Sequence, residues 1–477
     1  MAEEKQNGIP VPEEGTPEWL ELNKMAKVAV PIVLAIFTLG VLMQQAFGMI
    51  YVNIGDELGQ ANLAPLITSI PGIALGIVCV VYGSLGDFLS LRKMIVIGTA
   101  VFVAGSVLGL FGHLSIWIVI LARLIQSVGW QVSGSIFLVL VSKYIAKKDR
   151  VIWYGVFVAV FRFAAALGVF LAGYMTLIDW RILFGVGIIA APLIPILAKN
   201  LPDNHAAGAT IDVMGFTLIG LFAASVTMYF TDMTTFWFIA CIVTLIAFVV
   251  YINKAENPFI TPKMLTNPAF VMTMIVIFVG YFFSYTLNAG INNIGMNVFG
   301  LDSSQVSNLL VWSIILAGVM GFVAGPIIRK IGRKASVILA LACMGGGLIA
   351  VAFAIPRGEV LALAAAPCIY YFGTSFFYQP IVDTATLTVT AEESGRALGF
   401  NDLIQAITGS VGVALFGQLM ANGAMGDASI AGTASGLASS YANVFLIGGV
   451  IILGAMVIFM LSMKMIYSRS RAAEDEA

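Results

Sequence analysis

Charged residues are scarce in this sequence. Only 10% of the 477 residues are charged, 60% are hydrophobic, and the formal net charge is -1. A soluble domain cannot bury that much apolar surface, so lipid must be the main solvent of the chain. The near-neutral charge gives no argument for a nucleic-acid partner.

Cysteine and histidine are scarce as well, which excludes several kinds of site. The four cysteines lie in apolar segments without CxxC spacing, so we predict neither disulfides nor metal ligands: Cys79, Cys241, Cys343 and Cys368. The two histidines fall in loops and form no cluster. The sequence contains no G-x-x-x-x-G-K-[ST] loop for a nucleotide. We therefore expect no metal, no cofactor and no enzymatic activity.

Long apolar stretches dominate what is present. A membrane helix needs about 20 apolar residues. Fourteen stretches meet this length, and they predict an all-α membrane protein with helices near 27–49, 63–86, 94–112, 115–142, 151–177, 181–199, 211–231, 234–253, 268–297, 304–328, 336–355, 359–386, 397–420 and 441–465. The polar, acidic residues 1–24 lack the basic start and apolar core of a signal peptide, so we expect a cytoplasmic tail.

The positions of lysine and arginine predict the orientation of these helices. With the N-terminus inside, cytoplasmic segments hold 20 of the 24 basic residues, and the outer loops hold only Arg181 and Arg357. Both termini should therefore be cytoplasmic.

A repeated loop predicts how the helices are grouped. Gly83–Lys93 and Gly325–Lys334 have similar sequences, and each joins the end of one predicted helix to the start of the next. Eight helix starts separate them, where a plain six-plus-six duplication would give six. We predict two six-helix bundles, residues 25–200 and 263–465, with an inserted helix pair in 201–262 and tails at 1–24 and 466–477.

The first copy of the loop resembles motif A of the major facilitator superfamily, G-x-L-G/A-D-R-x-G-R-K. Gly83 would allow close helix packing, and Asp87 and Arg92 would form a latch that holds one conformation. Phe88 and Ser90 depart from the pattern, which would weaken that latch.

Two further segments carry the resemblance. Arg123-Leu124-Ile125-Gln126 resembles motif B, and an arginine at this depth must face protein or water. Arg123 could bind a ligand or simply tie helices together. Gly168 and Gly173 fit motif C, which is associated with antiporters, and we count both among the latch residues because small residues allow close helix packing. Val169 replaces the proline of the motif, which argues against export by antiport.

Other segments resemble the fourteen-helix drug:proton antiporter branch of that superfamily, among them Asp179-Trp180-Arg181. The branch commonly has an aspartate in the first helix, at the position of Gly48 here. The deep ions are instead Arg123 and Arg162, which favours an anionic ligand. We expect Arg162 to be the anion partner. An Arg162–Asp383 ion pair is the structural alternative.

Polar side chains in the apolar helices complete the predicted site. Beside Arg162, the candidate substrate-binding residues are Arg123, Gln126, Gln131, Gln45, Asn53, Tyr285, Asn288, Asn292, Tyr378 and Gln379. For each one, hydrogen bonding between helices is an equally good explanation. We expect Asp383, and next Asp402, to couple transport to protons, because a carboxylate in a low-dielectric site can hold a proton near neutral pH.

The whole chain looks most like bacterial proton-coupled bile-acid transporters. That resemblance implies a monomer in the bacterial inner membrane that takes up an amphipathic organic anion, such as a bile acid, with protons by alternating access. The alternative is a proton-antiport multidrug exporter. A non-transporting receptor or lipid scramblase on the same fold is a third possibility.

Overall fold

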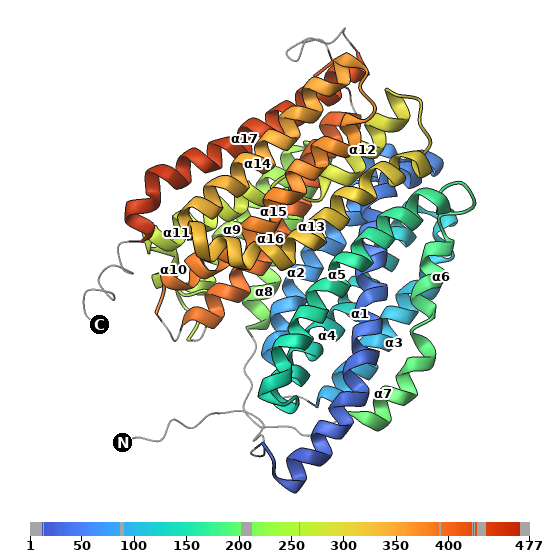
Figure 1. Ribbon diagram of the computed structural model, residues 1–477. Helices are drawn as coiled ribbons and strands as arrows, with labels where there is room; N and C mark the ends of the chain where they lie inside the picture. Colours follow the sequence, from blue (N-terminus) through green and yellow to red (C-terminus); the bar gives the residue numbers. More distant parts are fainter. Residues whose placement is uncertain are drawn as a thin grey trace.

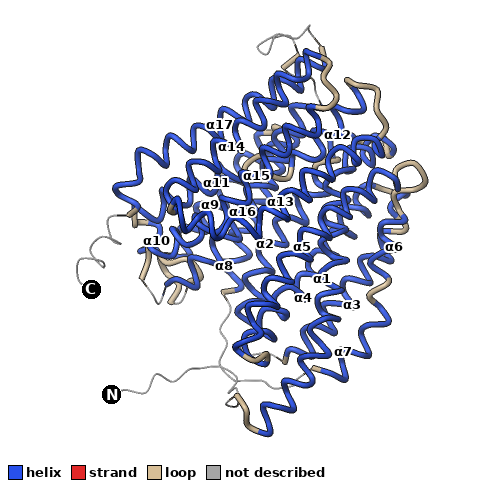
Figure 2. Tube along the Cα trace, in the orientation of Figure 1, coloured by secondary structure: helices blue, strands red, loops and turns tan. Residues whose placement is uncertain are grey.

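The fold is described from a computed structural model. It describes residues 12, 14–85, 90–201, 212–256, 258–390, 393–421, 423, 425–426 and 436–467. Within these residues every regular element is a helix (Figure 2). The N-terminal bundle contains α1 (Pro17–Glu57), α2 (Leu66–Leu85), α3 (Leu91–Gly109), α4 (Ile116–Tyr144), α5 (Lys147–Met175), α6 (Ile182–Ile188) and α7 (Ile194–Asn200).

The inserted pair and the C-terminal bundle follow. The pair is α8 (Val213–Asp232) and α9 (Thr235–Ile252). The C-terminal bundle contains α10 (Pro262–Leu265), α11 (Pro268–Tyr281), α12 (Thr286–Asn297), α13 (Ser303–Ile331), α14 (Arg333–Ala354), α15 (Ala362–Leu387), α16 (Ser394–Ala421) and α17 (Leu437–Ile466). The predicted fold, two six-helix bundles with an inserted pair, is confirmed (Figure 1).

Thirteen segments of the described chain are long and apolar enough to cross a membrane. The fourteenth span is α15, which is not among them. Its 26 residues cover about 39 Å at 1.5 Å per residue, more than a bilayer core requires. Tyrosines, Gln379 and Asp383 lower its hydropathy, and several of them face the site described below.

Two of the predicted spans are broken. The stretch 182–200 is interrupted at Pro192, which lacks an N–H and forces a short 3-10 turn between α6 and α7. The stretch 268–297 is interrupted at residues 282–285, between α11 and α12. Gly412 of α16 lies against this break, and a Cβ there would come 1.8 Å from the Phe282 carbonyl oxygen. Only glycine allows α16 to approach so closely.

The bundles meet at one end and separate at the other. We call the side that carries both termini the inner side. In Figure 1 the outer ends of both bundles come together at the upper right, whereas their inner ends diverge towards the lower left. Among the described residues, the hydrogen bonds between the two bundles all lie near the outer ends: Asn53–Ser303, Asn53–Met296, Asn292–Asn53, Asn308–Tyr174 and Gln418–Asn62. The outer side is thus closed.

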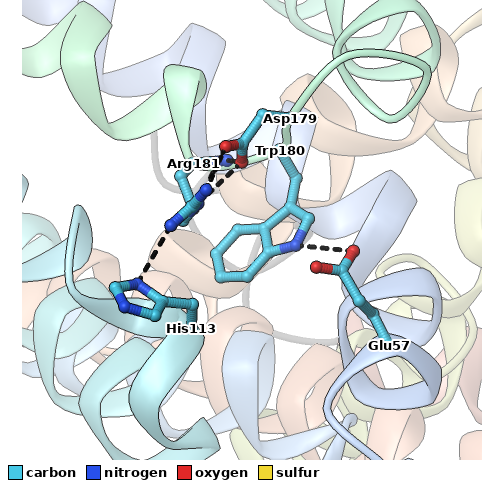
Figure 3. Close-up of polar contacts among 5 residues, drawn as sticks. All are labelled: Glu57, His113, Asp179, Trp180 and Arg181. Atoms are coloured by element: carbon cyan, nitrogen blue, oxygen red, sulfur yellow. Dashed lines mark hydrogen bonds and ion pairs between the residues drawn. The ribbon is translucent and has the colours of Figure 1, made fainter.

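A small polar cluster braces the outer end of the N-terminal bundle (Figure 3). Trp180 donates its indole N–H to Glu57 at 2.9 Å, which joins the loop before α6 to the end of α1. Arg181 pairs with Asp179 and contacts His113 Nδ1 at 3.0 Å. Arg181 holds the pKa of the Asp179 carboxyl below its usual range, chiefly by hydrogen bonding.

Candidate functional site

Polar side chains from both bundles gather where the bundles face each other. Asp402 of α16 accepts hydrogen bonds from Asn401 at 2.9 Å and from the Tyr378 hydroxyl at 3.5 Å. On the opposite side, Cys79 of α2 lies beside Gln131 of α4 and close enough to Asp402 to interact electrostatically. Asp402 is therefore held by neutral groups at the boundary between the bundles.

Arg162 of α5 lies in the same region. At Arg162, α5 packs closely against α13, because a Cβ at Gly318 of α13 would come 3.1 Å from the Arg162 Cβ. The phenols of Tyr281 and Tyr371 interact with it electrostatically, and the Tyr371 hydroxyl donates to Asn288 at 2.8 Å. Among the described residues no carboxylate forms an ion pair with Arg162. We define the central cluster as Arg162, Gln131, Tyr281, Tyr371, Tyr378, Asn288 and Asp402.

The central cluster is accessible rather than sealed. Arg162, Gln131 and Asp402 are half-buried, and Tyr378 is 45% exposed. It contains one group that is always cationic and one carboxylate, and tyrosine hydroxyls interact with each of them. Such a site can bind an amphipathic molecule by its polar end and can take up or release a proton.

Two predicted substrate-binding residues lie elsewhere, inside the N-terminal bundle. Arg123 is fully buried and donates to Gln126 and Gln44, each at 2.8 Å, while its guanidinium lies 4.6 Å from the Phe47 ring centroid. Gln126 in turn donates to Ser106 at 2.8 Å. This network joins α1, α3 and α4, as in the helix-tying alternative. Sequence reasoning did not find Gln44 or Ser106 as partners, because neither belongs to a motif.

Two other predicted residues lie in the closed outer end. Asn292 donates to Asn53 at 2.9 Å, and Asn53 donates to Ser303 at 3.3 Å and to the Met296 sulfur at 3.2 Å. We call this group the outer clasp. It joins α1 to α12 and to the start of α13, so these asparagines connect the bundles in this conformation and stand apart from the central cluster.

The prediction that Asp383 lies deep in the membrane was wrong. Asp383 is one helical turn from the inner end of α15, its side chain is 51% exposed, and it pairs with Arg333 at 2.7 Å. The alternative Arg162–Asp383 pair is therefore not formed. With Gln379 and Arg329, Asp383 lines an inner cavity of about 670 Å³ between α13 and α15. The predicted span 359–386 already placed Asp383 near its end, and what the sequence could not show is its ion pair with Arg333 of α14.

The remaining predicted substrate residues lie near the bundle boundary. Tyr285 packs between α2 and α16, where Cβ atoms at Gly72 and Gly409 would come 3.2 Å and 2.8 Å from its ring. Gln45 of α1 is half-buried and makes no hydrogen bond to another described residue. Sequence reasoning dismissed Cys79 as filler, and only the packing of α2 against α4 and α16 shows its place beside Gln131 and Asp402.

The structure describes four of the five predicted latch residues. Asp87 lies outside the described residues, and Gly83 is in the last turn of α2. Arg92 donates two hydrogen bonds, at 2.9 Å and 2.7 Å, to the Leu201 carbonyl just beyond α7. Gly168 lets α5 touch α1, since a Cβ there would come 2.3 Å from the Leu42 oxygen. Gly173 lets α5 touch α13 of the opposite bundle, since a Cβ at Gly173 would come 2.3 Å from the Ser303 oxygen.

Comparisons with known proteins agree with this architecture. The chain is 24% identical over 421 residues to the quinolone resistance protein NorB of Staphylococcus aureus (strain MRSA252), covering 83% of this chain and 88% of that relative. Its structure is similar to an auto-inhibited POT family peptide transporter, with a TM-score of 0.66 at 14% identity over 91% of this chain and 96% of that one. It is also similar to a D-xylose–proton symporter, with a TM-score of 0.60 at 12% identity over 89% and 97%.

The sequence profile named Major Facilitator Superfamily matches residues 32–413, which is most of the chain. The two bundles and the inserted helix pair of the chain are those of a multi-pass membrane transporter, and the chain belongs to the Major Facilitator Superfamily.

Proposed function

We propose that this protein is a proton-coupled exporter of amphipathic organic compounds, working by alternating access in the bacterial plasma membrane with both termini in the cytoplasm. This was the alternative to bile-acid uptake. The similarity to a quinolone resistance protein supports export, and nothing in the comparisons supports a bile acid as substrate.

One observation carries the proposal. Asp402 lies between the bundles, and its carboxylate accepts hydrogen bonds from the neutral side chains of Asn401 and Tyr378. A carboxylate without a cationic partner, partly removed from water, can gain and lose a proton during a cycle. In the inner-open conformation, the ionised Asp402 carboxylate binds the compound. In the outer-open conformation, a proton binds to Asp402 and displaces the compound, and the protein then carries that proton to the inner side.

The test compares two acids. In proteoliposomes with an imposed pH gradient, Asp402→Asn should abolish gradient-driven movement of a fluorescent lipophilic dye while leaving exchange of dye across the membrane. Asp383→Asn is the matched control: it removes a carboxylate from the inner-end ion pair and should keep gradient-driven transport. Unchanged coupling in Asp402→Asn would refute the role of Asp402. Loss of coupling only in Asp383→Asn would restore the original prediction.

A second candidate, uptake of an organic anion with a proton, is favoured by Arg162. No described carboxylate neutralises this arginine, so the central cluster carries net positive charge whenever Asp402 is protonated. An anion and a proton would then load together, which is symport. Uptake of a labelled bile acid that increases with an inward proton gradient would favour this candidate over export.

A further inference from the structure

The central cluster contains two charged side chains of opposite sign that do not neutralise each other. Arg162 belongs to α5 of the N-terminal bundle, and Asp402 belongs to α16 of the C-terminal bundle. Both are half-buried, and neither forms an ion pair with another described residue. A charge at membrane depth is costly unless it meets an opposite charge, a hydrogen-bonding group or water. The cluster therefore offers a cationic and an anionic partner to a ligand at the same time.

Tyr281 of α11 shows that the two charges belong to one site. Its phenol interacts electrostatically with Arg162 and with Asp402. The two charged groups thus lie within reach of a single side chain, although they are not in contact with each other. A ligand of modest size can meet both.

Both charged groups have hydrogen-bonding capacity left for a ligand. An ionised carboxylate has about four acceptor positions, and Asp402 uses them for Asn401 at 2.9 Å and Tyr378 at 3.5 Å. Arginine has five N–H donors, and those of Arg162 bond to no other described residue. The partners of Asp402 are neutral, so they position its carboxylate without cancelling its charge.

Aromatic rings lie beside the charged groups on both bundles. The Arg162 guanidinium is 5.7 Å from the centroid of the Phe161 ring. Phe161 is 6.2 Å from Phe37, which stacks on Phe157 at 4.5 Å. Phe157 and Phe161 are half-buried, as is Tyr281 on the C-terminal bundle. Such rings pack favourably against another aromatic ring, so the apolar part of a ligand here should be aromatic.

We propose that the central cluster recognises zwitterionic aromatic compounds, with the carboxylate of the ligand on Arg162 and its ammonium group on Asp402. This inference rests on the proposed export function, in which Asp402 exchanges the compound for a proton. A guanidinium can hold a carboxylate by two parallel hydrogen bonds, and a carboxylate accepts a charge-assisted bond from an ammonium group. A ligand with only one charge would remove water from the other charged side chain and leave it unpaired, which is costly.

The two ends of the ligand differ in their relation to the proton. Arg162 stays cationic at any pH of interest, so it holds the carboxylate throughout. Protonation of Asp402 removes the partner of the ammonium group alone. Because the two residues belong to different bundles, the zwitterion bridges the bundles, and a proton on Asp402 breaks that bridge at its C-terminal side.

The first test compares three ligands on the wild-type protein. The probe is Nα-dansyl-lysine, which has an aromatic ring system, one carboxylate and one ammonium group. Its methyl ester keeps only the ammonium group, and its Nε-acetyl derivative keeps only the carboxylate. Binding to the full-length protein in lipid nanodiscs is followed by dansyl fluorescence, with empty nanodiscs as the blank. We expect the zwitterion to bind at least about tenfold more tightly than either derivative.

The second test removes one charge at a time. Arg162→Gln should reduce the affinity for the zwitterion to that for the ester and leave the ester unchanged. Asp402→Asn should reduce it to that for the acetyl derivative and leave that derivative unchanged. Arg329→Gln is the matched control, since it removes an exposed guanidinium near the inner end of α13, and it should keep the preference for the zwitterion. The ligand series on the wild type decides the question if a variant does not fold.

Two outcomes would overturn the proposal. Equal affinities of the wild type for the three compounds would show that the two charges do not act together on a ligand. An Arg162→Gln variant that loses the ester as strongly as the zwitterion would show that the arginine shapes the site without binding the carboxylate.

The binding assay uses one pH and no gradient, so it is separate from the test of proton coupling. Unchanged coupling in Asp402→Asn together with a preference for the zwitterion would refute the proton role and leave the recognition. Lost coupling together with equal affinities would refute the recognition alone.

Discussion

Two intramembrane arginines lie on neighbouring helices of one bundle, and their surroundings differ. Arg123 is fully buried, with two amide oxygens and an aromatic ring around its guanidinium. Arg162 is half-buried at the boundary between bundles and has no hydrogen bond to another described residue. The Arg123 Nη1 and Nη2 groups are hydrogen-bonded, while its Nε has no partner among the described residues. A buried charge that bonds to a neighbouring helix holds helices together, whereas an accessible charge without such bonds is available to a ligand. Depth in the membrane alone does not separate these roles.

The largest expected effect is on the buried arginine. Arg123→Ala would leave a void and unpaired amides at Gln44 and Gln126, and we expect a loss of roughly 3–5 kcal/mol of stability. Thermal unfolding in detergent would measure it. A variant that melts like the wild type would break the comparison, because Arg123 would then not be structural.

The matching change at the boundary should affect transport instead of stability. Under the second candidate, uptake of an organic anion, Arg162→Ala should lower transport of the anion at least about tenfold, and Arg162→Lys should restore part of it, because lysine replaces the paired hydrogen bonds of guanidinium poorly. The melting temperature should change little. Normal transport and binding of the anion by a well-folded Arg162→Ala would remove this residue from the site.

Two glycines of α5 differ in the same way, since one lies inside the N-terminal bundle and the other at the boundary between the bundles. Gly168→Ala forces a methyl group against the Leu42 carbonyl inside the N-terminal bundle, so it should lower stability by about 1–3 kcal/mol. Gly173→Ala forces one against the Ser303 carbonyl of the opposite bundle. It should loosen the outer clasp, and the accessibility of a cysteine placed at Val52, next to the clasp residue Asn53, to an external thiol reagent would report that. Equal effects of both changes on stability alone would show that Gly173 has no role in closing the outer end.

The smallest effect is expected at the outer polar cluster. The pKa of Asp179 is lowered in the folded protein, so the stability it contributes is fully present above the usual aspartate pKa of about 3.9 and is lost as the pH falls through the lower folded value. Asp179→Asn should change the melting temperature by no more than about 2 °C at pH 7. The difference from wild type should disappear in strongly acidic buffer, and a larger shift at pH 7 would show that the cluster carries more than a surface ion pair.

The fold was predictable from the sequence, because the length and apolar character of each span are local properties and the repeated loop marks the duplication. The break at residues 282–285 was not, since it depends on Gly412 of a distant helix. Asp402, Arg162 and Gln131 could be identified as polar residues within apolar helices. The separation of Asn53 and Arg123 from that group depends on partners across the fold, which no local pattern contains. The substrate and coupling roles of all these residues stay predictions.

The low hydropathy of α15 has a consequence for biogenesis. The insertion machinery accepts helices by their own apolar character, and tyrosine, glutamine and aspartate weaken that signal. The polar face that suits α15 to its place in the protein therefore makes it a poor membrane segment alone. We expect it to enter the bilayer efficiently only together with α14, its extensive packing partner. A chain truncated to present α15 without α14 should leave much of it outside the membrane.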